Sequence, residues 1–432
     1  MIVANEQHSA SEQLSDKFLN LGQHKTVPPT YANYENLLNS AQSDELRQVF
    51  KKHFGFEPEK RPVECKKHAM SLWKADELSD RALVALVHRG INPHEAINGF
   101  LDKGISAIQN PPEEFLELWA QVTIEPEWLD WALLERGARI YRRYGVLGFM
   151  FQGIGSIDSY RNENIAKTLM STGQYADDTA FKRFVLTSNF WTKVSEPGGM
   201  RSFAPGWKVA IQVRLLHTLI RRAVLGSKNW DSEKLGMPIN QVGLLGAPLI
   251  SSVMMGQHLK MLGYRPTDSD IEAMMHLWRY VAHVMGRDVS DFPTTANEGL
   301  QVLYDLSNVS ENTDTPEGAR IGKSFIEAFK PRSDARGFGW LKEYVQYKIN
   351  IAQSLFFVSP QTRKAMNLPN PTFWGALYWM VRFPINRWTD KKRYDSSEFE
   401  NAYDKRVARE RYVWLNEHIK GSSLEYRPQP KY

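Results

Sequence analysis

The most informative stretch of the chain reads Trp207-Lys208-Val209-Ala210-Ile211-Gln212-Val213-Arg214-Leu215-Leu216-His217-Thr218-Leu219-Ile220-Arg221-Arg222. Its apolar residues recur at spacings of three and four, which predicts an α-helix. On that helix Ala210, Val213 and Ile220 lie close to His217, so the histidine projects from an apolar face. The stretch therefore predicts a helix that presents an imidazole to the interior of the protein.

The same helical spacing recurs along most of the chain, whereas signals for β-strands are scarce. There is no sustained apolar–polar alternation with hairpin turns, and no glycine-rich loop between a strand and a helix, which argues against nucleotide-binding α/β folds. The sequence therefore predicts an all-α fold. Helices are expected at residues 34–54, 127–144, 207–225, 242–262, 268–285, 294–309, 316–329, 341–357 and 397–418, with a proline- and aromatic-rich connection at 368–388.

The chain has 432 residues, enough to bury a large core. We predict one large helical domain in three parts, because the helical pattern becomes regular from residue 75 onward. Residues 1–74 form an N-terminal helical extension, residues 75–330 the core, and residues 331–432 a C-terminal helical and aromatic-rich extension.

The composition excludes several classes of protein. The net charge of +5 comes from 54 basic and 49 acidic residues and is mild, so no nucleic-acid partner is expected. The single cysteine, Cys65, forbids an internal disulfide, an iron–sulfur cluster and a four-cysteine zinc site, and its charged neighbours predict a surface thiol. Residues 1–19 lack the apolar stretch of a secretory signal, and residues 235–259 make a poor membrane span, so we expect a cytoplasmic protein.

The 207–222 helix offers what haem requires of a protein, namely an axial imidazole, an apolar wall and cations for the propionates. An apolar setting lowers the pKa of a histidine, which keeps the imidazole neutral and available to a metal. Arg214 and Arg221 lie one turn before and after His217, displaced to the same side by about 40–60°, and are candidate propionate partners. The alternative is a core histidine bonded to a backbone carbonyl, with the arginines reaching outward to solvent.

A second pair of candidate pocket residues lies upstream. Arg183 and Thr187 are four residues apart, so they share one helix face. A cation and a hydroxyl aimed at a pocket can bind a propionate or polarise oxygen. The alternative is a surface arginine beside a threonine that bonds its own helix backbone.

Several motifs occur together in a fixed order. They are Arg183-x-x-x-Thr187, Glu196-Pro197-Gly198-Gly199, Val213-Arg214-Leu215-Leu216-His217 with Ile220-Arg221-Arg222, Gly236-Met237-Pro238-Ile239-Asn240-Gln241, His276-Leu277-Trp278-Arg279-Tyr280 and Met285-Gly286. In this order, and with thirty residues from Thr187 to His217, the chain resembles the rubber oxygenase and latex-clearing protein family, which includes the MpaB-type oxygenases. The resemblance covers roughly residues 75–330.

This resemblance implies a haem b whose iron is bound by His217, in a pocket lined by Arg183 and Thr187. It also implies O₂-dependent cleavage of carbon–carbon double bonds in isoprenoid chains, with carbonyl products. Arg183 or a neighbouring donor is then expected to orient the oxygen in an apolar, water-excluding pocket.

The chain departs from the family pattern at two positions. Latex-clearing enzymes can carry a lysine just before the pocket threonine as a second axial ligand, where this chain has Leu186. The carboxylate thought to act as base in those enzymes falls, without gaps, on Lys167, with Asp158 and Glu163 as the nearby acids. The sixth iron ligand, the base and rubber as substrate therefore stay open.

Two further features have competing interpretations. Glu272, His276 and His283 share a helix face and could hold a metal, but a di-iron bundle needs two Glu-x-x-His pairs and this chain has none, so we predict supporting roles in the core. The aromatic segment 373–388 is either an interfacial element in peripheral contact with a membrane or one wall of the core.

The sequence as a whole predicts a haem-dependent oxygenase that acts with O₂ on an apolar alkene such as an isoprenoid. Three alternatives stay open. They are a haem monooxygenase or peroxidase that uses the same pocket, a non-catalytic haem carrier or sensor, and a helical interaction protein that binds no haem.

Overall fold

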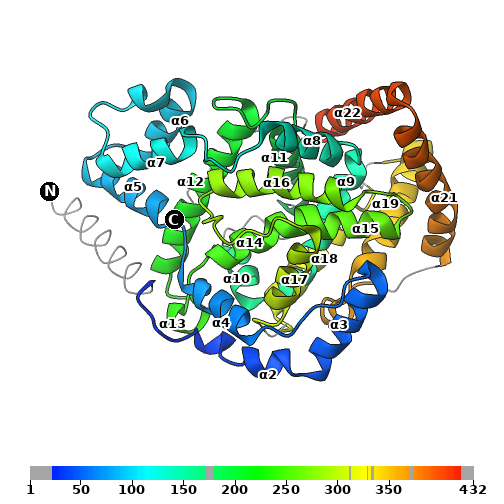
Figure 1. The fold of residues 1–432 in the computed structure, drawn as a ribbon, viewed down its shortest axis with the longest axis horizontal. Helices are drawn as coiled ribbons and strands as arrows, with labels where there is room; N and C mark the ends of the chain where they lie inside the picture. The colour runs from blue at the N-terminus through cyan, green and yellow to red at the C-terminus, as the bar shows by residue number, and fades with distance from the viewer. Residues whose placement is uncertain are drawn as a thin grey trace.

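The computed structural model describes residues 22–171, 179–310, 313–327, 329–331, 335–369 and 373–419. Every regular element within these ranges is helical, which confirms the predicted all-α fold (Figure 1). The α-helices that flank or cover the centre are α2 (Tyr34–Leu38), α3 (Ala41–Phe54), α4 (Pro62–Met70), α5 (Glu77–His88), α6 (Pro93–Lys103), α7 (Glu113–Thr123), α8 (Trp131–Arg142), α9 (Gly145–Gly155), α10 (Glu163–Ser171) and α11 (Thr179–Val194). They are followed by α12 (Pro205–Gly226), α13 (Ser232–Leu235), α14 (Gln241–Leu249), α15 (Met255–Met261), α16 (Asp268–Val284), α17 (Ala296–Ser307), α18 (Pro316–Glu327), α19 (Gly337–Phe357), α20 (Pro360–Ala365), α21 (Phe373–Asp395) and α22 (Ser397–Ile419).

Helix α16 runs across the middle of the molecule (Figure 1). It begins with a capping box formed by Thr267 and Asp270, and it is apolar on most sides, as expected of a helix that other helices surround. It packs against α8 so closely that a Cβ at Gly137 would lie 2.0 Å from the carbonyl oxygen of Ala273. The absence of a side chain at Gly137 therefore sets the distance between these two helices.

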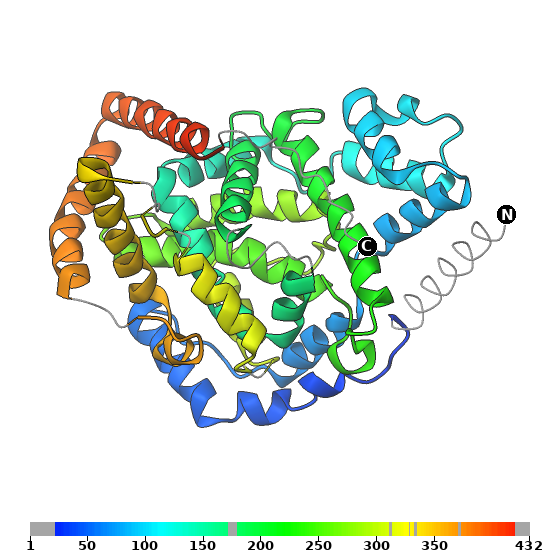
Figure 2. The same ribbon diagram turned by 180° about the vertical axis from the view of Figure 1, so that it is seen from behind.

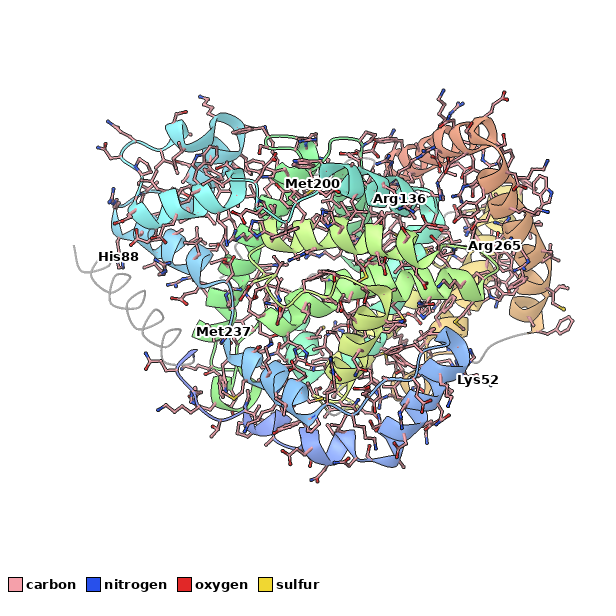
Figure 3. The ribbon with its side chains drawn as sticks, viewed as in Figure 1. Lys52, His88, Arg136, Met200, Met237 and Arg265 are labelled. Carbon is pink, nitrogen blue, oxygen red and sulfur yellow. The ribbon has the colours of Figure 1, made fainter. Side chains whose placement is uncertain are left out.

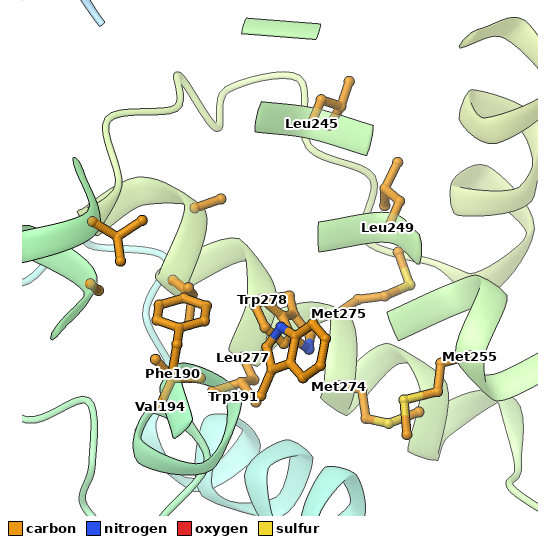
Figure 4. Packing of buried hydrophobic residues seen from close by; sticks show 14 of the residues in the cluster. Phe190, Trp191, Val194, Leu245, Leu249, Met255, Met274, Met275, Leu277 and Trp278 are labelled. Carbon is orange, nitrogen blue, oxygen red and sulfur yellow. The ribbon is translucent and has the colours of Figure 1, made fainter. Parts of the chain in front are cut away.

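The main core lies between α16 and the helices on either side of it. Figure 4 shows Phe190 and Trp191 of α11 beside Leu277 and Trp278 of α16, with the Phe190 and Trp278 ring centroids 6.4 Å apart. The buried cluster also takes in residues from both ends of the described chain, from Tyr31 to Leu415. The division at residues 74 and 330 stays a prediction, and all three parts contribute to one core.

One predicted connection is wrong. Residues 373–395 form the 23-residue helix α21, with Pro384 inside it. Pro384 lies on the exposed side of α21, where a backbone carbonyl that loses its helical partner can bond to water instead. The proline is therefore tolerated, and it does not end the helix.

The helix predicted at 242–262 is present but divided. Between α14 and α15 the chain forms a π-helical turn, η5 (Ile250–Met254), which follows Pro248. Over the described residues, one helical stretch, Gln241–Met261, is long and apolar enough to cross a membrane, but 56% of its most apolar window is buried inside the protein. Buried core helices of soluble proteins can have the same length and apolar composition, so these properties only weakly indicate a membrane span.

The prediction of a surface thiol at Cys65 is also wrong. Cys65 is fully buried in α4, and its Sγ lies 3.8 Å from the carbonyl oxygen of Asp305 in α17. Its charged sequence neighbours face outward while Cys65 faces the core, because adjacent helical residues point in different directions. Burial raises the pKa of this thiol to about 12, so it stays protonated.

Candidate functional site

Helix α12 carries His217 between two helices that are far apart in the sequence. It packs against α11 and against α5, and Pro205 occupies its first turn, where proline is favoured. The predicted helix at 207–225 is thus confirmed. The turn before α12 contains Gly198, whose amide donates a hydrogen bond to Glu135 Oε1 at 2.9 Å.

The imidazole of His217 is neutral and incompletely bonded. Burial, together with the charges of Arg221 and Arg183, lowers its pKa to about 3. Its Nδ1 atom is buried and has no hydrogen-bond partner in the described part of the chain. Such an atom costs about 1–3 kcal/mol of folding free energy, so it marks a position where the fold gives up stability.

The side chain of His217 is not wholly covered, although α12 around it is largely buried. Leu186 and Thr187 of α11 and Ile220 of α12 are likewise only partly buried. The ring therefore keeps accessible surface while protein encloses it closely enough to shift its pKa. This combination fits an imidazole that faces a ligand. It does not fit the alternative of a core histidine bonded to a backbone carbonyl, because Nδ1 has no hydrogen-bond partner in the described chain.

The two arginines that flank His217 are engaged elsewhere. Arg214 Nε and Nη2 donate to Asp76 Oδ2 and Oδ1 at 2.6 and 2.8 Å, and Nη2 also donates to Gln121 Oε1 at 2.7 Å. Arg221 Nε and Nη2 both donate to Asp80 Oδ2, at 2.8 and 2.6 Å. All four charged side chains are buried, and we call them the Asp–Arg clamp.

The Asp–Arg clamp joins α12 to α5. Between its two ion pairs, the Thr218 and Ser79 hydroxyl oxygens lie 2.8 Å apart. Both arginines have a structural partner, and a propionate at Arg214 or Arg221 would have to displace a buried carboxylate; their binding of a propionate stays a prediction. Neither arginine reaches outward to solvent, which contradicts that part of the alternative interpretation.

Asp76 and Asp80 are the important residues that the sequence did not single out. They lie four apart near the start of α5, and Asp76 also caps that helix by accepting from the Ser79 amide. Their spacing would place both on one face of a helix. Nothing in the sequence indicates that this face meets α12.

Residues of two sequence motifs, Gly286 and Gln241, lie beside the Asp–Arg clamp. Gly286 has a φ of +84°, and a Cβ there would lie 2.2 Å from Asp76 Oδ2, so a side chain would collide with the clamp. Gln241 binds beside it, with Nε2 donating to the Gly286 carbonyl at 3.0 Å and Oε1 accepting from Arg287 at 3.1 Å. These motif residues thus build the support for α12.

Arg183 and Thr187 lie on α11, which packs against α12. The positive charge of Arg183 is among the causes that lower the pKa of His217, and its role in a pocket stays a prediction. The Thr187 hydroxyl donates to the Arg183 carbonyl oxygen at 3.0 Å within α11, as in the alternative interpretation. A pocket role for Thr187 stays a prediction.

The acids considered as bases are bound by other groups. Glu163 forms ion pairs with Lys167 at 2.7 Å and with Lys234 at 3.4 Å. Asp158 is exposed and accepts from the Ser359 hydroxyl at 3.4 Å. The base therefore stays open.

The histidines of the second candidate metal site, His276 and His283, are engaged in hydrogen bonds and aromatic contacts. His276 Nε2 accepts from the Asp130 amide at 3.0 Å, and His283 Nε2 lies 3.2 Å from the Gln121 carbonyl oxygen. Both rings also pack edge-on against Trp128. Within the described ranges, no group of three or more His, Cys, Asp or Glu residues is arranged to hold a metal ion.

Comparison with known proteins places this helical site in a family. Residues 141–383 match the family described as "ER-bound oxygenase mpaB/B'/Rubber oxygenase, catalytic domain". The match covers more than half of the chain, and the protein belongs to this family.

Two relatives agree with this assignment. The chain is 25% identical over 265 residues to the rubber oxygenase of Streptomyces sp. (strain K30), a match that covers 57% of this chain and 61% of that protein. It thus spans less than two thirds of this relative. The structure of latex clearing protein LCP in the closed state superposes with a TM-score of 0.55 at 18% identity, over 82% of this chain and 91% of that one, and so shares the fold.

Proposed function

We propose that the protein is an oxygenase that holds haem b through His217 and uses O₂ to cleave carbon–carbon double bonds in an isoprenoid or another apolar alkene. The observation that carries this proposal is the imidazole of His217. It is neutral, enclosed, and left without a partner at Nδ1. Membership of the oxygenase family supports the type of reaction, and the relative named as a rubber oxygenase supports an alkene substrate.

The residues around His217 fit haem better than a metal ion held by side chains alone. The described residues offer iron a single histidine there and no cluster of further ligands. Haem would bring its own nitrogen ligands for iron, and His217 would add the neutral imidazole that is a usual protein ligand of haem. Arg183 then supplies a cation beside the ring, now that Arg214 and Arg221 are paired with aspartates.

Haem, when bound, supplies the iron chemistry that activates O₂. His217 would hold the group through its ring, while the Asp–Arg clamp fixes the helix that carries it. Leu186 and Ile220, which are partly buried, would offer apolar surface that excludes water from the alkene. Arg183 would place a positive charge next to a propionate or to negative charge that develops on oxygen.

The visible spectrum of the purified protein tests the cofactor. Wild type is compared with His217→Ala, and haem is quantified as the pyridine haemochrome. We expect a Soret band in wild type and its loss in His217→Ala. His283→Ala is the matched control, because it removes a partly buried imidazole that is already hydrogen-bonded, and it should keep its haem.

A wild type that stays colourless with adequate haem supply, and takes up no added haemin, would contradict the proposal and favour a helical interaction protein. For a haem-loaded protein, turnover of an isoprenoid under labelled O₂ separates the remaining alternatives. Cleavage places labelled oxygen in both carbonyl products. A monooxygenase or peroxidase would leave the carbon chain intact, and a haem carrier would give no product.

A further inference from the structure

The outer face of helix α21 is apolar and exposed. Phe373, Met380 and Trp388 expose 72%, 61% and 55% of their surface. At about 100° per residue they fall on one line along the helix, together with three other exposed residues. We call this set the α21 stripe: Phe373, Leu377, Met380, Val381, Pro384 and Trp388.

The opposite face of α21 is fixed to the body of the protein. Asn386 Nδ2 donates to the Leu262 carbonyl at 2.9 Å, and Asp390 accepts from the Arg265 amide at 2.6 Å. The helix lies at the outer edge of the molecule in both views (Figures 1 and 2), and the labelled Arg265 marks its point of attachment (Figure 3). These bonds hold the α21 stripe on the outer side of the helix, away from the body of the protein.

Positive charge accompanies the α21 stripe. Arg387, Lys391 and Lys392 are exposed at the end of the helix, and Lys392 Nζ lies 5.9 Å from the ring centroid of Trp388. Asp390 is the acidic residue within 373–392, and it is buried and paired with Arg393. The exposed face of this segment is thus apolar, aromatic and cationic; the exposed Asp395 at the last residue of α21 leaves Arg387, Lys391 and Lys392 in excess.

We propose that the α21 stripe docks the protein on the surface of an anionic lipid bilayer, with α21 lying in the plane of the membrane. Aromatic and aliphatic side chains enter the headgroup region of a bilayer, and lysines and arginines beside them bind acidic headgroups. Helix α19, which packs against α21, adds exposed apolar residues at its start, among them Phe338 and Trp340. This inference extends the proposed function and does not depend on it.

The charges favour a lipid surface over a second copy of the chain. A two-fold interface would place the same patch on both subunits and bring two sets of Arg387, Lys391 and Lys392 together. Like charges at an interface oppose association. An anionic bilayer offers an apolar layer and the opposite charge on one surface.

Co-sedimentation of the full-length protein with vesicles tests the proposal. Vesicles of phosphatidylcholine alone are compared with vesicles that also contain phosphatidylserine. We expect wild type to bind the anionic vesicles and to bind the neutral vesicles weakly. M380E/W388E should lose binding, whereas Val63→Glu, at a position that is 76% exposed in α4, should bind as wild type.

A second variant tests the charges without touching the α21 stripe. K391Q/K392Q should weaken binding to anionic vesicles by about fivefold for each lysine removed, and should leave binding to neutral vesicles unchanged. Circular dichroism confirms that each variant is folded.

Three results would overturn the proposal. They are no binding of wild type to either vesicle, equal binding of wild type to both, and full binding by M380E/W388E. A fourth such result would come from light scattering without vesicles, if wild type were a dimer and the M380E/W388E variant a monomer. Because none of these measurements requires haem or turnover, their outcome is separate from that of the proposed function.

Discussion

Helix α12 has two neighbouring faces that treat their polar groups in opposite ways. On the face toward α5, Arg214 and Arg221 are buried and paired with carboxylates at hydrogen-bonding distance. On the face about 60° away, His217 has a buried Nδ1 without a partner in the described chain. The first face pairs its charges through α5 and leaves only Asp80 Oδ1 without a partner there, whereas the second leaves an imidazole nitrogen unpaired at the residue expected to bind the cofactor.

The largest expected effect comes from breaking the paired face. Arg214→Met removes one partner of a buried ion pair and leaves Asp76 as an unpaired buried charge, so the unfolding free energy should fall by roughly 3–5 kcal/mol. Urea denaturation followed by circular dichroism measures it. Arg265→Met is the control, since this exposed side chain should change the value by less than about 0.5 kcal/mol. A loss below about 1 kcal/mol for Arg214→Met would show that the clamp does not hold α12.

The next largest effect is a loss of stability at low pH, which would show that burial keeps other histidines neutral as it does His217. Burial lowers the pKa of His68 and of His258 to about 4. The unfolded chain takes up a proton near pH 6.5 and the folded protein does not, so stability is lost as the pH falls below about 6.5. Each histidine should cost roughly 2 kcal/mol between pH 7 and pH 5.

Thermal denaturation of wild type and His68→Gln at both values of pH measures this effect. The variant should lose less stability than wild type on acidification. Identical pH dependence in the two proteins would mean that His68 is protonated in the folded state.

A smaller effect of opposite sign is expected on the unpaired face. His217→Leu replaces a buried polar atom that lacks a partner by an apolar side chain of similar size, so the haem-free protein should gain about 1 kcal/mol of unfolding free energy. The same variant should bind no haem. Differential scanning calorimetry and the visible spectrum give the two readouts. A stability loss of more than about 1 kcal/mol would show that His217 serves the core.

The smallest effect concerns Thr187, whose hydroxyl donates to its own helix. Thr187→Val should change the unfolding free energy by less than about 0.5 kcal/mol, because such local bonds add little to a helix. The alkene turnover of the haem-loaded variant then decides between its two interpretations. A turnover reduced tenfold or more at unchanged stability would assign the hydroxyl to the pocket, and an unchanged turnover would leave it a helical residue.

The two faces of α12 also differ in how far the sequence could predict them. The position of His217 on an apolar face follows from residue spacing, and its neutral state follows from that setting. The partners of Arg214 and Arg221 lie more than one hundred residues earlier in the chain, in α5, so no local pattern could reveal them. For the same reason, no local pattern could indicate that Cys65 of α4 lies against the carbonyl of Asp305 in α17.

Residue spacing alone predicted the all-α fold, many of the helices and the apolar setting of His217, because helical periodicity is a local property of the chain. The packed structure was needed to show which charges pair with one another, that α21 continues through Pro384, and that the α21 stripe is exposed. These features depend on which surfaces meet or stay uncovered once the helices pack. The contacts that set them join residues far apart in the chain, and local spacing carries no record of such contacts.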